Sequence, residues 1–150
     1  MIKIFTKILY KRAIKFTKEN LKHIEPEDMA ICHGYRNNRC HWNSYTEYRL
    51  NPDNIKVIAT VCIKPDDSGA MIHFINYNPE EKYYFDITLG ASNIFYYCQY
   101  IIGECELSSE YVENMGVKLG ELKYWLIDRS FKNKYVRKFY KWLEDKYNII

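Results

Sequence analysis

Three side chains in the middle of the chain have the types and the order of a thiol-based catalytic triad: Cys40, His73 and Asp86. A thiol whose proton is taken by an imidazole becomes a nucleophile, and a carboxylate beside the imidazole holds it in the useful tautomer. Cys40 lies between Arg39 and His41, in a polar and basic stretch where an inert core cysteine is not expected. The three residues together predict covalent acyl chemistry if the fold brings them into contact.

The segments around His73 and Asp86 have the pattern of a β-hairpin. With residues 78–81 as a four-residue loop, His73 lies directly opposite Asp86. The Cβ atoms of such a pair are roughly 5 Å apart, which is close enough for a carboxylate to orient an imidazole. Because side chains alternate along a strand, Thr88 is expected on the same face as both.

The elements around this hairpin predict an α+β domain. A helix is expected over residues 40–50, because residues 51–53, Asn-Pro-Asp, stop it. Residues 55–63 alternate Ile, Val and Ala on one face, which is typical of a half-buried strand. This order predicts an antiparallel sheet of at least three strands with the Cys-bearing helix packed on it. Further along, residues 110–127 suit a helix broken at its glycines.

Positive charge is concentrated at the two ends of the chain. Residues 1–22 carry seven basic side chains against one acidic, and residues 129–150 carry seven against two, which leaves the middle of this +3 chain at net −8. Apolar residues recur at helical spacing in both ends, so basic helices are expected at both termini. Such helices suit nucleic acid or another anionic partner, but lysine is also a good helix former on a solvated face.

Size and composition predict one domain over residues 1–150. A chain of 150 residues that is 47% hydrophobic can bury one core. No apolar run approaches the roughly 18 residues of a membrane-spanning helix, so no membrane partner is expected. Five unevenly spaced cysteines favour reduced intracellular thiols over a disulfide framework. No phosphate-binding loop or dinucleotide fingerprint is present, so no cofactor is expected.

Two Cys-His pairs, Cys32-His33 and Cys40-His41, offer a competing metal chemistry. Zinc accepts two cysteines and two histidines, although structural zinc sites usually space their cysteines two to four residues apart. Adjacent Cys and His side chains rarely reach one ion together. In this alternative Cys40 is a ligand and not a nucleophile, so the two hypotheses exclude each other.

Residues 34–90 resemble the papain-like and transglutaminase-like cysteine hydrolases, in which a cysteine starts a helix and histidine and aspartate lie on adjacent antiparallel strands. More narrowly, Cys40-His-Trp-Asn43-Ser, then His73, then Asp86-Ile-Thr88 resemble small, mostly uncharacterised phage and bacterial proteins with Cys-x-x-Asn-Ala/Ser, His-Ala-Trp and Asp-Pro-Thr motifs. The chain departs from these motifs at residues 74–75, which are Phe-Ile, and at residue 87, which is Ile. The basic ends lie outside the match.

This resemblance implies a papain/transglutaminase-like core and a place in the cytoplasm of a bacterium or an infected host cell. Cys40 would attack a peptide, isopeptide or side-chain amide of a protein or peptide substrate, with hydrolysis or transfer to an amine as the outcome. His73 would carry the proton, and Asp86 would orient it. The supporting positions would be the backbone N–H of Cys40 and the amide of Asn37 or Asn38 at the oxyanion, with Asn43 and Thr88 behind them.

A non-catalytic role is the remaining alternative. The same fold can serve as a binding or interaction protein that holds an anionic partner through its basic ends, with nucleic acid the less favoured choice. Fifteen tyrosines supply aromatic contact surface for such a role. An enzyme should lose activity when Cys40 or His73 is replaced, whereas a nucleic-acid binder should tolerate both changes and bind with steep salt dependence.

Overall fold

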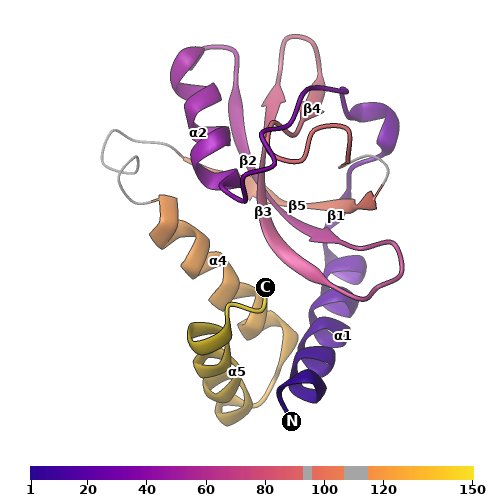
Figure 1. The fold of residues 1–150 in the computed structure, drawn as a ribbon, viewed down its shortest axis with the longest axis vertical. Helices are drawn as coiled ribbons and strands as arrows, with labels where there is room; N and C mark the ends of the chain where they lie inside the picture. The colour runs from indigo at the N-terminus through magenta and orange to yellow at the C-terminus, as the bar shows by residue number, and fades with distance from the viewer. Residues whose placement is uncertain (93–95, 107–114) are drawn as a thin grey trace.

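The chain folds into a curled, five-stranded antiparallel sheet with its helices gathered on one face (Figure 1). A computed structural model describes residues 1–92, 96–106 and 115–150. The α+β class and an antiparallel sheet of more than three strands are thereby confirmed. The strands, in the order in which they lie across the sheet, are β1 (Lys22–His23), β5 (Cys98–Glu104), β2 (Lys56–Ile63), β3 (Ala70–Asn78) and β4 (Tyr83–Phe85).

In the part of the chain that the structure describes, four helices and one short 3-10 turn accompany the sheet. Of the helix expected over 110–127, residues 110–114 lie outside the described residues, and the helix runs through both of its glycines without a break. The elements are α1 (Ile2–Asn20), η1 (Pro26–Asp28), α2 (Cys40–Leu50), α4 (Met115–Ser130) and α5 (Lys134–Tyr147).

Strand β2 lies at the centre of the sheet, with β5 on one side and β3 on the other. Seven of its eight residues are buried, so the half-buried strand expected from sequence is wrong. Val57 and Val61 belong to the core under the helices, whereas Ile58 and Thr60 are buried on the opposite face. A strand that is covered on both faces does not need a polar side.

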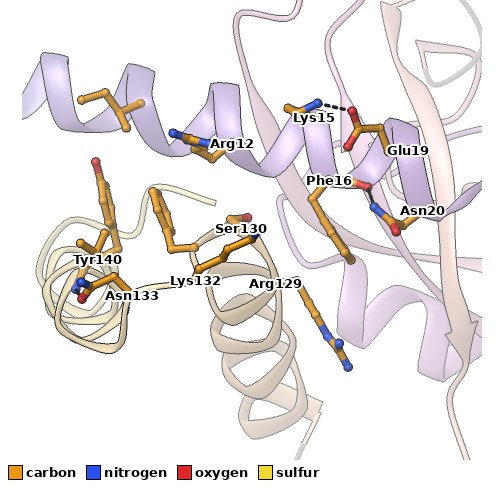
Figure 2. A pocket seen from close by; sticks show the side chains of 13 residues that line it. Arg12, Lys15, Phe16, Glu19, Asn20, Arg129, Ser130, Lys132, Asn133 and Tyr140 are labelled. Atoms are coloured by element: carbon orange, nitrogen blue, oxygen red, sulfur yellow. Dashed lines mark hydrogen bonds and ion pairs between the residues drawn. The ribbon is translucent and has the colours of Figure 1, made fainter.

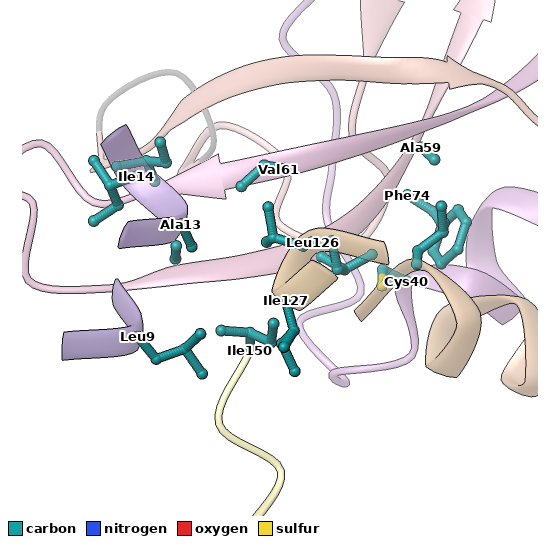
Figure 3. Packing of buried hydrophobic residues seen from close by; sticks show 14 of the residues in the cluster. Leu9, Ala13, Ile14, Cys40, Ala59, Val61, Phe74, Leu126, Ile127 and Ile150 are labelled. Atoms are coloured by element: carbon teal, nitrogen blue, oxygen red, sulfur yellow. The ribbon is translucent and has the colours of Figure 1, made fainter. Parts of the chain in front are cut away.

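The main core lies between the sheet and the helices. Phe74 and Ile72 of β3 meet side chains from α1, α4 and the C-terminus, and Leu126 and Ile127 are fully buried there (Figure 3). Cys40, at the start of α2, lies at the margin of this core beside Phe74. The first residue of α2 is therefore held between the core and the edge of the sheet.

The opposite face of the sheet is covered by loops. A small cluster of Ile24, Met29, Ile58 and Ile75 anchors residues 24–36 on that face. His73 is buried there too, one position from Phe74, because side chains alternate along β3. The loop-covered face of the sheet therefore holds the polar side chain of His73, away from the main core.

The β3–β4 hairpin differs from its expected register by two residues. Asn78 pairs with Tyr83, so the loop covers residues 79–82 and not 78–81. The strand then ends at Phe85, and Asp86 is the first residue after it. The sequence predicted that Asp86 is a strand residue opposite His73, and this prediction is wrong. Thr88 lies in the turn that follows.

The two basic ends form helices that lie close together. Phe5 of α1 contacts Phe139 of α5, with ring centroids 5.0 Å apart, and the Tyr10 hydroxyl donates to the carbonyl of Ile149 at 2.9 Å. Both helices lie at the end of the molecule away from β4 (Figure 1). Among the described residues, no helix combines the length and apolarity that crossing a bilayer requires.

Candidate active site

His73 and Asp86 form a buried ion pair between β3 and the segment after β4. His73 Nε2 lies 2.6 Å from Asp86 Oδ2, and the two residues are 3% and 1% exposed. Asp86 is held by an Asx turn, in which its Oδ1 accepts the backbone N–H groups of Thr88 and Leu89, each at 2.9 Å. The turn fixes the carboxylate without help from a strand partner, which the register prediction had required.

The thiol approaches His73 across the open edge of β3. Strand β4 pairs only with residues 76–78 of β3, so the backbone of Phe74 is free on its outer side. Helix α2 covers that edge: the Ser44 hydroxyl donates to the carbonyl of Phe74 at 2.9 Å, and the N–H of Phe74 is among the groups that lower the pKa of the Cys40 thiol. His73 precedes Phe74 on β3, and its side chain points to the opposite face of the sheet. From the edge of β3, Cys40 reaches the imidazole of His73.

The surroundings of Cys40 favour its thiolate. Burial opposes ionisation, but hydrogen bonds from His41 and His73, the charge of His73 and the N–H of Phe74 outweigh it and lower the pKa of the Cys40 thiol to about 6. Cys40 begins α2, where the helix dipole adds in the same direction. A thiol with this pKa is largely ionised at neutral pH.

His73 is held in its protonated form. Burial would lower its pKa, but the charge and hydrogen bond of Asp86, together with those of Cys40, raise the pKa of His73 to about 10. The same charge and hydrogen bond of His73, with the N–H groups of the turn, outweigh burial and hold the pKa of Asp86 below its usual value. Since Nε2 faces Asp86, Nδ1 is the nitrogen left for the thiol. Both pKa shifts favour the charged forms, a Cys40 thiolate beside a His73 imidazolium.

No other cysteine has this environment. Burial raises the pKa of Cys32, Cys62 and Cys105, the last to about 11. Cys62 and Cys105 are buried, whereas Cys98 is partly exposed at the start of β5. All five cysteines are free of disulfides, and only Cys40 adjoins an imidazole that belongs to an ion pair.

The supporting residues named from the sequence form a polar chain behind the site. Asn43 donates through Nδ2 to Thr88 Oγ1 at 2.9 Å and to Asn37 Oδ1 at 2.8 Å, and Asn37 also accepts the backbone N–H of Arg39 at 3.1 Å. Asn43 and Thr88 thus connect α2 to the Asp86 turn. The Asn37 side chain is engaged with Asn43, and Asn38 is exposed in a left-handed backbone conformation with φ of 55°.

A second connection runs along residues 30–36, which lie beside residues 84–90. The N–H of Tyr35 donates to the carbonyl of Ile87 at 2.8 Å, and Cys32 Sγ donates to the carbonyl of Asp86 at 3.3 Å. Gly34 and Gly90 cross so closely that a Cβ on either would lie 2.5–2.6 Å from the other's backbone nitrogen. The loop that leads to Cys40 and the loop that contains Asp86 are therefore packed and hydrogen-bonded against each other.

The proposed zinc ligands do not assemble. Within residues 1–92, 96–106 and 115–150, no group of three or more His, Cys, Asp or Glu side chains is arranged to hold a metal ion. Cys32 instead bonds the carbonyl of Asp86, and His41 lies beside Cys40, with its buried Nδ1 unpartnered. In the part of the chain that the structure describes, Cys32, His33, Cys40 and His41 therefore do not form a metal-binding group.

Two features of the site were not foreseen from sequence. The sequence placed His41 in the basic neighbourhood of Cys40 and among the zinc ligands, but it did not predict that His41 lowers the pKa of the Cys40 thiol. Ser44, one helical turn past Cys40, matches the last position of the Cys-x-x-Asn-Ala/Ser motif, but its bond to β3 could not be predicted, because that bond depends on where β4 ends.

Comparison of the chain with protein-family models, with curated protein sequences and with solved structures finds no match.

Proposed function

We propose that the chain is a cysteine-dependent acyl-transfer enzyme that cleaves a peptide, isopeptide or side-chain amide through Cys40, His73 and Asp86. The observation that carries the proposal is the buried pair of His73 and Asp86, 2.6 Å apart, beside the cysteine that begins α2. The charge and hydrogen bond of His73 lower the pKa of the Cys40 thiol, in keeping with that geometry. Neighbouring ionisable side chains that shift one another's pKa values are typical of catalytic sites.

In the first half of the reaction, the Cys40 thiolate attacks the carbonyl carbon, and a C–S bond forms. The carbonyl oxygen becomes an oxyanion. When the tetrahedral intermediate collapses, the C–N bond breaks, and His73 gives its proton to the departing amine. The product on the enzyme is a thioester of Cys40 beside a neutral His73, which Asp86 keeps oriented.

In the second half, His73 accepts a proton from water or from an acceptor amine, which attacks the thioester. The C–S bond breaks, and the Cys40 thiolate and the His73 imidazolium are restored. Water yields hydrolysis, and an amine yields acyl transfer. The residues of the triad have the same roles in both outcomes.

The start of α2 supplies the donor for the oxyanion in this proposal. No side chain caps α2, and its first paired backbone N–H is that of Asn43, which donates to the carbonyl of Arg39 at 2.9 Å. The N–H of Cys40 precedes this bond and points out of the helix start. A backbone donor on the nucleophile itself is well placed for the oxygen of the carbonyl that it attacks.

The fold supports assignment to the papain-like or transglutaminase-like class as part of the same proposal. A cysteine at a helix start and a histidine on an antiparallel strand match the arrangement of this class, whereas Asp86 departs from it, because it follows β4 and is held by a turn. The net −8 charge of residues 23–128 favours basic protein or peptide substrates. A groove of about 420 Å³ lined by Cys32, Glu47 and Phe85 lies beside the Asp86 turn, and Glu47 is its one acidic side chain.

The test is acylation by p-nitrophenyl acetate, an activated ester that makes few demands on substrate recognition. We expect a burst of nitrophenolate, an acetyl group mapped to Cys40 by mass spectrometry, and slow turnover. Cys40→Ala should abolish both signals, and His73→Ala should slow the burst by a factor of about 10²–10⁴. Cys98→Ala, which removes a partly exposed thiol outside the site, is the matched control.

Acetylation that is spread evenly over several thiols, or that proceeds equally fast in His73→Ala, would contradict the proposal. In that case the thiolate–imidazolium pair would be a structural feature of a binding protein.

A further inference from the structure

The surface formed by α1 and α5 combines positive charge with exposed apolar side chains. More than half of the large hydrophobic residues that are exposed among the described residues lie on these two helices or at Met1. Ile4 is 63% exposed and Trp142 is 53% exposed. Exposed apolar groups that cluster on one face mark an interaction site, whereas isolated ones do not.

The apolar residues are contiguous from one helix to the other. Ile4 and Ile8 are one turn apart on α1, and Ile8 lines a cleft together with Val136 of α5. Phe139 lies 6.1 Å from Trp142, ring centroid to ring centroid, on the same helix. We call this set, Ile4, Ile8, Val136, Phe139 and Trp142, the terminal apolar strip.

Basic side chains flank the strip. A cleft of about 570 Å³ opens between α1 and the α4–α5 connection, with Arg12 on one side and Lys132 on the other (Figure 2). Lys146 Nζ lies 5.2 Å from the centre of the Trp142 ring. Among the described residues, neither Arg12 nor Lys132 makes an ion pair with an acidic side chain, so their charges are available to a partner.

We propose that this face is a peripheral docking surface for an anionic lipid bilayer. The expectation of no membrane partner rested on the lack of a membrane-spanning segment, which binding at the bilayer surface does not require. Amphipathic helices that carry Trp, Phe and Ile beside many lysines insert their apolar side chains at the headgroup boundary, while the lysines pair with anionic headgroups. The long stems of lysine and arginine allow the charges to stay in water as the strip enters the bilayer. The cleft between Arg12 and Lys132 has room for a phosphate-bearing headgroup.

Other occupants fit the face less well. A second copy would bring one strongly positive face against another, because residues 1–22 and 129–150 carry net +6 and +5. Nucleic acid would pair with the basic groups, but it offers nothing to the exposed aliphatic side chains of Ile4 and Ile8. An anionic bilayer complements both the charge and the apolar strip.

The test is co-sedimentation of the full chain with vesicles of phosphatidylcholine alone or mixed with phosphatidylserine, at increasing sodium chloride. We expect binding to the mixed vesicles that weakens as salt rises. Two double variants probe the two components: Ile4→Ser with Trp142→Ser, and Arg12→Glu with Lys132→Glu. Each should weaken binding roughly tenfold.

Matched controls place the same chemical changes elsewhere on the surface. Leu50→Ser removes an apolar side chain that is 73% exposed at the end of α2, and Lys64→Glu with Lys82→Glu reverses two exposed charges in the sheet turns. Both controls should bind vesicles as the unchanged chain does, and circular dichroism should show that all variants are folded.

The proposal is overturned if phosphatidylserine does not increase binding, or if the strip and charge variants bind as well as their controls. Tighter binding to duplex DNA than to vesicles would assign the face to nucleic acid. Self-association that Ile4→Ser with Trp142→Ser abolishes would assign it to a second copy.

Discussion

Ser44 donates its hydroxyl proton to the backbone carbonyl of Phe74 at 2.9 Å, across the edge that β4 leaves unpaired. Asn76 adds a second bond of the same kind, because its Nδ2 donates to the carbonyl of Ser44 at 2.9 Å. Helix α2 thus takes the place of a neighbouring strand along this part of β3. The replacement brings Cys40 to the N–H of Phe74 and to the side chain of His73.

Replacement of Ser44 by alanine should loosen this connection. Ser44 is fully buried, so the variant leaves the carbonyl of Phe74 without its donor, and we expect the free energy of unfolding to fall by about 1–2 kcal/mol. Alkylation of Cys40 should slow as the thiol loses its fixed position. Urea unfolding and iodoacetamide kinetics measure the two effects.

Thr46→Ala is the control for the Ser44 variant. Thr46 lies on the exposed side of the same helix, where its hydroxyl donates to the carbonyl of Trp42 at 2.8 Å. Its loss should leave both stability and alkylation nearly unchanged. Equal effects of the two substitutions would mean that Ser44 acts through helix propensity and not through the edge of β3.

The reactivity of Cys40 should follow its own ionisation and depend on Asp86. Because the pKa of Cys40 is lowered to about 6, its alkylation rate should be half-maximal near that pH and level off above it, far below the pH at which Cys62 or Cys105 reacts. Asp86→Asn removes the charge that raises the pKa of His73. The imidazolium is then less available, so the midpoint for Cys40 should move to higher pH.

A control with the same local geometry isolates the role of the charge. Asp66 Oδ1 accepts the N–H of Ser68 at 3.0 Å in an exposed Asx turn, much as Asp86 Oδ1 accepts that of Thr88. Asp66→Asn should therefore leave the Cys40 profile unchanged. Alkylation is read for each cysteine by mass spectrometry. An unchanged midpoint in Asp86→Asn would mean that the Asp86 charge does not influence the pKa of the Cys40 thiol.

The candidate residues of the site could be predicted from the sequence better than their arrangement in space. The order of Cys40, His73 and Asp86 and the α+β class were visible, because residue type and alternation are local properties. The hairpin register was two residues off, because Asp86 enters a turn that closes on its own side chain and that alternation does not reveal. The cover of β3 by α2 and the pairing of the short strand β1 with β5 depend on contacts between distant segments, which spacing along the chain does not encode.

Gly90 should be among the least replaceable positions outside the triad. It has φ of 58°, and a Cβ there would lie 2.6 Å from the backbone nitrogen of Gly34. Gly90→Ala should therefore destabilise the fold by more than about 1 kcal/mol, and it should slow Cys40 alkylation by shifting the Asp86 turn. Gly103→Ala in β5, where a Cβ meets nothing within 4 Å, is the control and should have little effect. Thermal unfolding and alkylation of both variants decide the matter, and similar losses in both would argue against the close crossing.

The stability of the chain should depend on pH in a way that distinguishes the thiolate–imidazolium pair from two independent groups. His73 has a folded pKa of about 10 against an ordinary value of 6.5, so its stabilisation is complete below pH 6.5 and is lost as the pH rises through 10. Cys40 has a folded pKa of about 6 against an ordinary value of 9.0, so its stabilisation is complete above pH 9 and is lost as the pH falls through 6. Between pH 6.5 and 9 the two slopes cancel, because the folded and unfolded forms hold the same number of protons at these two residues.

Cys40→Ala removes one side of this cancellation. His73 remains paired with Asp86, so the free energy of unfolding of the variant should fall relative to the unchanged chain as the pH rises from 6.5, by up to about 1.4 kcal/mol per pH unit. Adding His73→Gln to Cys40→Ala should flatten the difference again, and Cys98→Ala should show none. Urea unfolding at pH 6.5 and 8.5 measures the slopes. Parallel curves for Cys40→Ala and the unchanged chain would mean that His73 is neutral in the folded protein, and the thiol would then need a proton acceptor from the start of the reaction.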